Sequence, residues 1–292
     1  MTPPNTEPIF LLGPTGSGKS AAAVELAERL GNAEIISADA YQVYRGMPII
    51  TAAPSEEEME RIPHHLIGFL DPAEDNDAAT HARRAGECIR RLRESGKRPI
   101  ITGGSGLYVK FISHGISPAP PSDPALRAEL SRLAPEELVR RLQEADPEGA
   151  AATDLCNLRY VERNLEIVLL GGKPLSYWRN NWQQPIGRGC VINRSVEELD
   201  ARIAARTEQM LQEGAIEEVE ALNPDSLSHT AAKTLGLAQV QDYLAGRLKR
   251  VELAAAITLA TRQYAKRQRT WLRREKWLVP VTDVTELYRA FE

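Results

Sequence analysis

The sequence predicts an α/β protein whose core is a doubly wound parallel sheet, interrupted by an inserted, mostly helical subdomain. Three observations support this prediction. Short apolar runs alternate with segments of helical periodicity, a glycine-rich loop follows the first run, and a proline cluster at residues 115–124 precedes a long helical stretch. With 292 residues the chain is long for one domain and short for two, which suits a core with one insert.

The elements before the proline cluster alternate in type. "EPIFLLGP" at residues 7–14 is a short β-rich run, and residues 20–30 have helical spacing with many Ala, Leu and Glu. A second apolar run at residues 33–39 precedes a helix expected over residues 78–96, after which residues 98–104 form a third strand. This alternation implies a parallel sheet that helices cover on both faces.

The insert follows the proline cluster, which has the composition of a linker. From residue 123 to about residue 182 the pattern is helical throughout. We therefore place the insert at residues 118–187, and we expect the core to consist of residues 1–117 and 188–292.

The chain after the insert is expected to return to the sheet and then to end in helices. "RGCVINRS" at residues 188–195 has the composition of a strand. The remainder is predicted to be helical, and residues 196–222 and 251–275 are its longest segments.

Composition limits the location and the partners of the protein. No apolar run is long enough to span a bilayer and the first residues lack the layout of a signal peptide, so we expect a cytoplasmic monomer with no membrane partner. Cys88, Cys156 and Cys190 stand far apart, which argues against a disulfide scaffold or a cysteine zinc site. The net charge of −4 argues against non-specific coating of nucleic acid but is compatible with a local basic strip.

The glycine-rich loop matches the P-loop pattern G-x-x-x-x-G-K-[ST] through Gly13, Gly18, Lys19 and Ser20. Glycines let backbone N–H groups turn toward phosphate oxygens, Lys19 would reach between phosphates, and the Ser20 hydroxyl would ligate Mg²⁺. The motif does not identify the phosphate-bearing molecule. ATP and GTP are the usual ligands, and the absence of an Asn-Lys-x-Asp signature argues against GTP.

Asp39 is the carboxylate that ends the second predicted strand. Ligands of open α/β sheets bind beyond the carboxyl ends of the strands, so this side chain is expected at the binding crevice. A cap or turn, a Mg²⁺ ligand and a general base all remain open for it, because the spacing does not separate them.

Several further motifs resemble one family in the same order along the chain. "SADAYQVYRGMPIITAAP" at residues 37–54 is similar to a characteristic motif of the tRNA dimethylallyltransferase (tRNA isopentenyltransferase) family. The matches that follow are "PHHLIGFLDP" (63–72), "GGSGLYVKFI" (103–112), "SDPALRAEL" (122–130), "RNLEIVLLGGKPLS" (163–176) and "ATRQYAKRQRTWLRRE" (260–275).

The resemblance implies that the bound phosphate is the leaving group of dimethylallyl diphosphate. The acceptor would be the exocyclic amine of the adenine 3′ of the anticodon in tRNA, with Asp39 as its base and with Lys19, Ser20 and Mg²⁺ assisting departure. Lys233 stands where relatives have an arginine and keeps the charge without the bidentate fork. We assign diphosphate binding to Gly13, Pro14, Thr15, Gly16, Ser17, Gly18, Lys19, Ser20, Lys233 and Arg262.

The resemblance also implies a set of tRNA contacts in the core and in the insert. Gln42 matches the motif glutamine expected to hydrogen-bond the target adenine, and an amide can pair bidentately with an adenine edge. Such an enzyme must extrude its base from the anticodon loop. The assigned residues are Asp39, Ala40, Tyr41, Gln42, Ser105, Arg127, Arg159, Arg163, Lys266 and Arg269.

A basic strip is expected on the last long helix. Arg262, Lys266, Arg269 and Arg273 are spaced by four, three and four residues, which places them on one helix face almost without Glu partners at i±4. This pattern favours anion binding, although such stripes are usually solvated faces. The expected core side consists of Val251, Ala254, Thr258, Ala265 and Leu272.

Departures from the family pattern leave substrate affinity in question. They include Ala40, Tyr41, Pro48, Ile50 and Ala53 in the first motif. The closest alternative function is a free-nucleotide isopentenyltransferase acting on AMP or ADP, followed by a P-loop kinase or ATPase and by a non-enzymatic RNA-binding protein. A helical insert and a basic strip favour a macromolecular acceptor, because a mononucleotide would leave both without a role.

Overall fold

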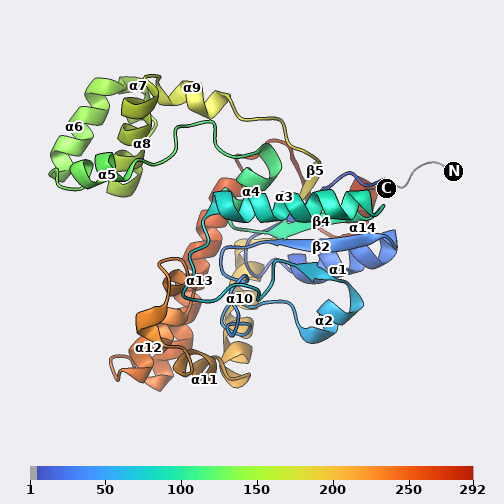
Figure 1. The fold of residues 1–292 in the computed structure, drawn as a ribbon. Coiled ribbons are helices and arrows are strands. Elements are labelled where there is room, and N and C mark those ends of the chain that lie inside the picture. The colour runs from blue at the N-terminus through green and yellow to red at the C-terminus, as the bar shows by residue number, and fades with distance from the viewer. Residues whose placement is uncertain (1–4, 292) are drawn as a thin grey trace. The chain divides into compact units, whose positions relative to one another are not determined.

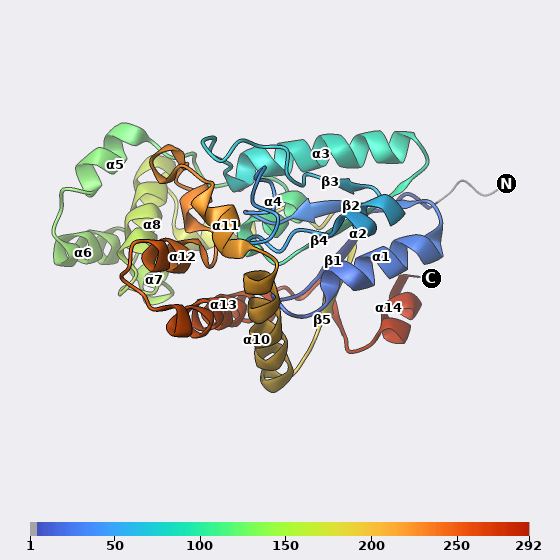
Figure 2. The ribbon, with the colours of Figure 1, turned by 90° about the horizontal axis from the view of Figure 1, so that it is seen from below.

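The computed structural model describes residues 5–291 as two compact units (Figures 1 and 2). The first unit comprises the chain up to Ser113 and from Pro185 onward, and the second is His114–Gln184. The second unit thus begins and ends within a few residues of the insert that the sequence places at 118–187. The Ile186 N–H donates to the Ser113 carbonyl (2.9 Å), so the chain leaves and re-enters the first unit at one point.

A six-stranded parallel sheet forms the centre of the first unit, as the sequence predicts. Its strand order is β3-β2-β4-β1-β5-β6, so that β1 lies in the interior, between β4 and β5. The strands are β1 (Ile9–Leu12), β2 (Ala33–Ala38), β3 (His64–His65), β4 (Arg98–Gly103), β5 (Arg188–Ile192) and β6 (Leu278–Val281).

The sequence pattern does not predict the two edge strands, β3 and β6. The prediction of an all-helical remainder is wrong at β6, which pairs in parallel with β5. Pro280 disguises this strand, because proline cannot donate to a ladder and is accepted only at edges. The strand β3 has only two residues, and the His65 ring contacts the Glu34 carboxylate of β2 (2.7 Å).

Helices cover both faces of the sheet (Figure 1). Alternate residues of β1 point to opposite faces, and all four are buried. One face packs against α1 (Lys19–Leu30) and α14 (Val284–Phe291), with α2 (Glu56–Arg61) beside α1. The other packs against α3 (Ala78–Glu94) and α4 (Gly106–His114).

A separate hydrophobic cluster joins the late helices to the segment that follows β2. Its helices are α10 (Val196–Gln212), α11 (Ala215–Glu220), α12 (Leu237–Leu244) and α13 (Arg250–Leu272), seen from below in Figure 2. The helix expected over residues 196–222 is broken at Gly214, whose φ of 102° requires glycine. This cluster places α10 and α13 against each other beside the end of β2.

The second unit is a helical body with its own core, as expected from its sequence pattern. Proline occupies the first turn of three of its helices, where its missing N–H has no cost. The helices are α5 (Pro124–Leu130), α6 (Pro135–Ala145), α7 (Pro147–Ala151), α8 (Leu158–Gly171) and α9 (Leu175–Asn180). Within residues 5–291, no helix combines the length and the apolar composition that crossing a bilayer would need.

Candidate active site

The glycine-rich loop connects β1 to α1 and ends at the N-terminus of that helix. Gly16 and Gly18 have φ of 82° and 85°, in the left-handed region where a side chain would be strained. The Ser17 N–H donates to the Pro14 carbonyl (3.1 Å), which closes the turn. Loop and helix together have the geometry of an anion-binding site.

Side chains from distant parts of the chain hold this loop in place. Arg202 Nε donates to the Gly16 carbonyl (2.6 Å), and Arg194 Nε donates to the Ser17 carbonyl (2.7 Å). At Thr15, the loop residue before Gly16, the backbone N–H donates to the side-chain oxygen of the buried Gln268 (2.8 Å). These partners lie 177 to 253 residues away in sequence, so no local motif could have revealed them.

One pocket brings the loop together with Asp39. Lys19, Ser20 and Asp39 line it, as the sequence predicts, and Arg206 of α10 joins them. Arg206 Nη2 donates to the Thr15 hydroxyl (2.5 Å). The other lining residues are Thr15, Tyr41, Gln42, Ile50, Thr51, Ala52, Thr207, Met210, Thr234, Leu235, Ile257, Thr261, Tyr264 and Gln268.

The pocket confines two cations close to one carboxylate. Burial lowers the pKa of Lys19 to about 8, Asp39 opposes that shift, and Arg206 adds to it. Burial also lowers the pKa of Arg206, again against the effect of Asp39. Burial disfavours the charged form of both cations, and an anion bound beside them stabilises it, so the site is suited to a phosphate-bearing ligand.

Asp39 follows the last residue of β2 and uses its two oxygens differently. Oδ1 accepts the Tyr41 N–H (2.9 Å), which is the turn role considered from the sequence. Oδ2 accepts from the Ser105 hydroxyl (3.4 Å), and that hydroxyl also contacts the Tyr264 hydroxyl (3.2 Å). The turn bond orients the carboxylate without engaging both oxygens, so a turn role and a chemical role coexist.

Gln42 lines the same pocket with its amide held at both ends. Its Nε2 donates to the Ala52 carbonyl (2.9 Å), and its Oε1 accepts from the Ser37 hydroxyl (2.9 Å). An amide has two N–H groups and two lone pairs, so one donor and one acceptor remain for a ligand. That pair is what bidentate contact with an adenine edge requires.

The helix α13 has two polar faces. The sequence predicts the basic one, and the structure shows a second, uncharged one. The buried or half-buried Thr261, Tyr264 and Gln268 face the pocket at spacings of three and four residues. Because these side chains are polar but uncharged, the sequence pattern does not distinguish them from the core side of the helix. The prediction that Val251 belongs to the core side is wrong, because this residue lies in the first turn of the helix and is 86% exposed.

The basic strip lies on a different face of α13. Arg262, Lys266, Arg269 and Arg273 line one surface cleft, as their spacing predicts. The expectation that they lack acidic partners holds only within the helix, because Arg262 Nε pairs with Asp200 of α10 (3.4 Å).

Two cations assigned to the diphosphate lie elsewhere. Among residues 5–291, the lining of the pocket that contains Lys19 includes neither Lys233 nor Arg262. Lys233 is exposed and contacts the His229 ring (2.5 Å), while the neighbouring Thr234 and Leu235 face the pocket. Arg206 is the additional cation that the structure places there.

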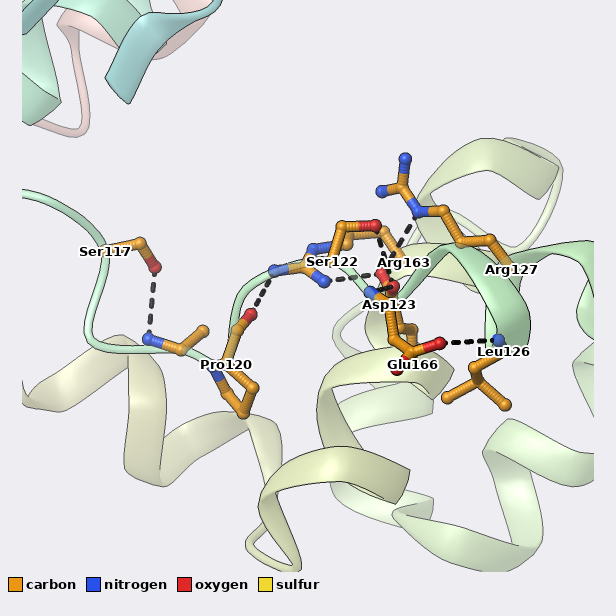
Figure 3. A network of polar contacts seen from close by, with 9 residues as sticks. Ser117, Pro120, Ser122, Asp123, Leu126, Arg127, Arg163 and Glu166 are labelled. Carbon is orange, nitrogen blue, oxygen red and sulfur yellow. Dashed lines mark hydrogen bonds and ion pairs between the residues drawn. The ribbon is translucent and has the colours of Figure 1, made fainter. Parts of the chain in front are cut away.

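Arg127 and Arg163 of the insert converge on the buried Glu166 (Figure 3). Glu166 accepts from Arg163 Nη1 (2.5 Å) and Arg127 Nε (3.3 Å), and it also binds Ser122 and the Asp123 N–H. Burial raises the pKa of Glu166, but these bonds outweigh it and hold the pKa below its usual range. Both arginines therefore have a structural role in the insert.

Exposed side chains lie beside this network on α8. Arg159 is exposed, and so is Tyr160, whose exposed fraction is 61%. Their exposure leaves both side chains accessible to a large ligand of the insert.

Comparison with known proteins gives a consistent result. A family model described as IPP transferase matches residues 42–275. The chain is 57% identical to a tRNA dimethylallyltransferase of Akkermansia muciniphila over 92% of this chain and 91% of the relative. It is 40% identical to tRNA dimethylallyltransferase 1 of Citrifermentans bemidjiense over 92% and 91% of the two chains.

Two solved structures resemble the whole chain. The full-length tRNA isopentenylpyrophosphate transferase of Bacillus halodurans is 32% identical with a TM-score of 0.70, over 98% of this chain and 95% of that one. A eukaryotic dimethylallyltransferase acting on tRNA is 26% identical with a TM-score of 0.77, over 95% and 74%. From its P-loop pocket and these similarities, the chain belongs to the IPP transferase family.

Proposed function

We propose that this enzyme transfers a dimethylallyl group from dimethylallyl diphosphate to the exocyclic amine of the adenine 3′ of the anticodon in tRNA. Its relatives are tRNA dimethylallyltransferases, which supports transfer of this group to tRNA. The observation that carries the finer proposal is the single pocket that contains Lys19, Arg206 and Asp39. In this pocket, the cations Lys19 and Arg206 can bind an anionic leaving group, and the Asp39 carboxylate can act as the base for the acceptor.

The reaction in this pocket is a substitution at carbon. The adenine amine forms a bond to the allylic carbon while the bond from that carbon to the diphosphate oxygen breaks. Asp39 hydrogen-bonds the amine, takes its proton as the new bond forms and releases it to solvent. An aromatic amine is a poor nucleophile, so a base fixed at hydrogen-bonding distance raises its reactivity. No covalent intermediate with the enzyme is required.

Charge stabilisation on the departing diphosphate comes from the loop side of the pocket. Lys19, Arg206 and the loop N–H groups face the place where negative charge develops. The Ser20 hydroxyl lines the same pocket and offers a hard oxygen donor of the kind that Mg²⁺ prefers, so this residue fits a bound metal ion. When bound through Ser20, Mg²⁺ supplies additional neutralisation of the leaving group.

The tRNA contacts are proposed from two sides. Gln42 is proposed to bind the everted adenine, together with Ser105, and its amide beside Asp39 in the pocket supports this role. Lys266 and Arg269 of α13 line the cleft that contains the basic strip, and their positive charges are suited to phosphates of the flanking nucleotides. Arg159 of the insert is exposed, and we propose the same role for it. We propose that the enzyme acts as a monomer in the cytoplasm.

Donor binding is expected to weaken as pH rises through about 8. The pKa of Lys19 is lowered to about 8, so the ammonium that grips the diphosphate is charged below this value and lost above it. The measurement is kcat/KM for the donor between pH 6.5 and about 9.5, which reports on the free enzyme. Lys19→Arg, which stays charged throughout, should remove the decline. A wild-type profile that stays flat to pH 9.5 would contradict this role.

The proposed reaction is tested by incubating the protein with labelled dimethylallyl diphosphate and either unmodified tRNA or AMP. After digestion, we expect label in isopentenyladenosine from the tRNA sample. Label in AMP alone would indicate a free-nucleotide isopentenyltransferase. Phosphate release from ATP with no prenyl transfer would indicate a kinase or ATPase.

A further inference from the structure

One wall of the pocket is a single helix-like turn at residues 47–53. The Thr51 N–H donates to the Met47 carbonyl (3.2 Å), and the Ala52 N–H donates to the Ile49 carbonyl (3.0 Å). Ala52 has a φ of 48°, a left-handed conformation that alanine rarely adopts. Such a conformation persists only when its surroundings hold it.

Glu218 of α11 holds this turn from outside. Its carboxylate accepts the Ile49 N–H at Oε2 (2.9 Å) and the Ile50 N–H at Oε1 (2.7 Å). N–H groups at the start of a helical turn have no partner within the turn, and a carboxylate is their most favourable acceptor. The two segments are 168 residues apart in sequence, so this contact serves the tertiary structure.

The far end of the turn reaches the residue assigned to adenine recognition. The Ala52 carbonyl accepts from Gln42 Nε2 (2.9 Å), while Ser37 donates to Gln42 Oε1 (2.9 Å). These two contacts decide which end of the amide faces which way. If the Ala52 carbonyl moved, the amide could rotate and exchange the donor and the acceptor that it presents to the pocket.

We propose that Glu218 is a positioning residue for the acceptor base, acting through residues 49–52 on the amide of Gln42. The inference rests on the proposed transfer to tRNA adenine and adds a determinant of acceptor recognition. Glu218 is not among the residues that line the pocket in the described chain, so its effect on the acceptor is indirect. Among the described residues, no hydrogen bond links this turn to the P-loop or to Arg206, which form the donor side of the pocket.

The test is Glu218→Gln, which retains one carbonyl acceptor and turns N–H donors toward the other backbone N–H. Loss of this charged hydrogen bond should raise KM for unmodified tRNA about tenfold, with KM for dimethylallyl diphosphate unchanged. Glu217→Gln is the matched control, because Glu217 is the exposed neighbour on the same helix. The thermal midpoint of each variant is measured alongside, because partial unfolding lowers the concentration of active enzyme and hence the apparent kcat, while KM for both substrates is unchanged.

A double-mutant cycle separates positioning from a purely structural role. Gln42→Leu removes the amide, so adding Glu218→Gln to that variant should raise the tRNA KM by less than about twofold. Additive effects, or an equal rise in both KM values, would overturn the inference. Wild-type enzyme without any transfer to tRNA would refute the proposed function instead. Normal transfer with an unchanged tRNA KM in Glu218→Gln would refute this inference alone.

Discussion

Replacing Asp39 with asparagine is expected to lower kcat for transfer to tRNA by about 10²- to 10⁴-fold, the range of general-base contributions. Asparagine can keep the turn bond from the Tyr41 N–H, so the local backbone is retained. It cannot take the proton from the amine. Asp39→Ala is expected to remove nearly all transfer. The measurement is single-turnover transfer with saturating substrates, together with tRNA binding, which both variants should retain.

Asp71→Asn provides a matched control for this prediction. Asp71 Oδ1 accepts the Ala73 N–H (2.9 Å), the same local bond that Asp39 makes, but Asp71 is exposed and is not among the pocket-lining residues of the described chain. Its substitution should leave kcat unchanged. Normal turnover in Asp39→Asn would refute the assignment of the base, and weak tRNA binding would indicate a role in recognition instead.

Arg206→Ala is expected to lower kcat/KM for dimethylallyl diphosphate by about 10²- to 10³-fold, as for removal of one donor from a site of developing negative charge. The substitution removes a cation of the pocket and the hydrogen bond to the Thr15 hydroxyl. Arg206→Lys keeps the charge but not the planar fork, so an intermediate value is expected. Steady-state kinetics with varied donor at saturating tRNA provide the measurement.

Arg262→Ala tests whether the sequence or the structure identifies the cation that binds the diphosphate. Arg262 lies in the cleft on α13 and pairs with Asp200, so its loss should leave donor kcat/KM close to that of the wild type. Equal losses in Arg206→Ala and Arg262→Ala would contradict the placement described here. Thermal unfolding of both variants controls for the loss of packing around the arginine stem.

The features that the sequence predicted correctly are encoded locally. The strands at β1, β2, β4 and β5 are short apolar runs, and the P-loop is a contiguous motif with a strand before it and a helix after it. The sequence predicts Asp39 at the binding crevice, because the carboxyl ends of the strands meet at one edge of a parallel sheet. Each of these inferences depends on neighbours within a few residues, which a single sequence contains.

The residues that complete the site depend on contacts between distant segments. Arg206 is one of two arginines on α10, and its spacing does not distinguish it from Arg202, which holds the loop backbone. Gln268 lies within a recognised motif, but its bond to the loop spans 253 residues. The two glycines at the end of β4, Gly103 and Gly104, show the same limit. A Cβ at Gly103 would lie 2.4 Å from the Ala38 carbonyl, and one at Gly104 would lie 2.4 Å from Gln268 Nε2.

The hydrogen bond between Ser113 and Ile186 lies where the chain leaves the first unit and returns to it, so the two connections of the insert are side by side. Because the insert is attached at one point, its length and sequence can change while the geometry of its attachment stays the same. The entropy of closing such a loop grows only slowly with its length. A change within the insert therefore leaves the P-loop pocket unaltered, because every residue that lines this pocket belongs to the first unit.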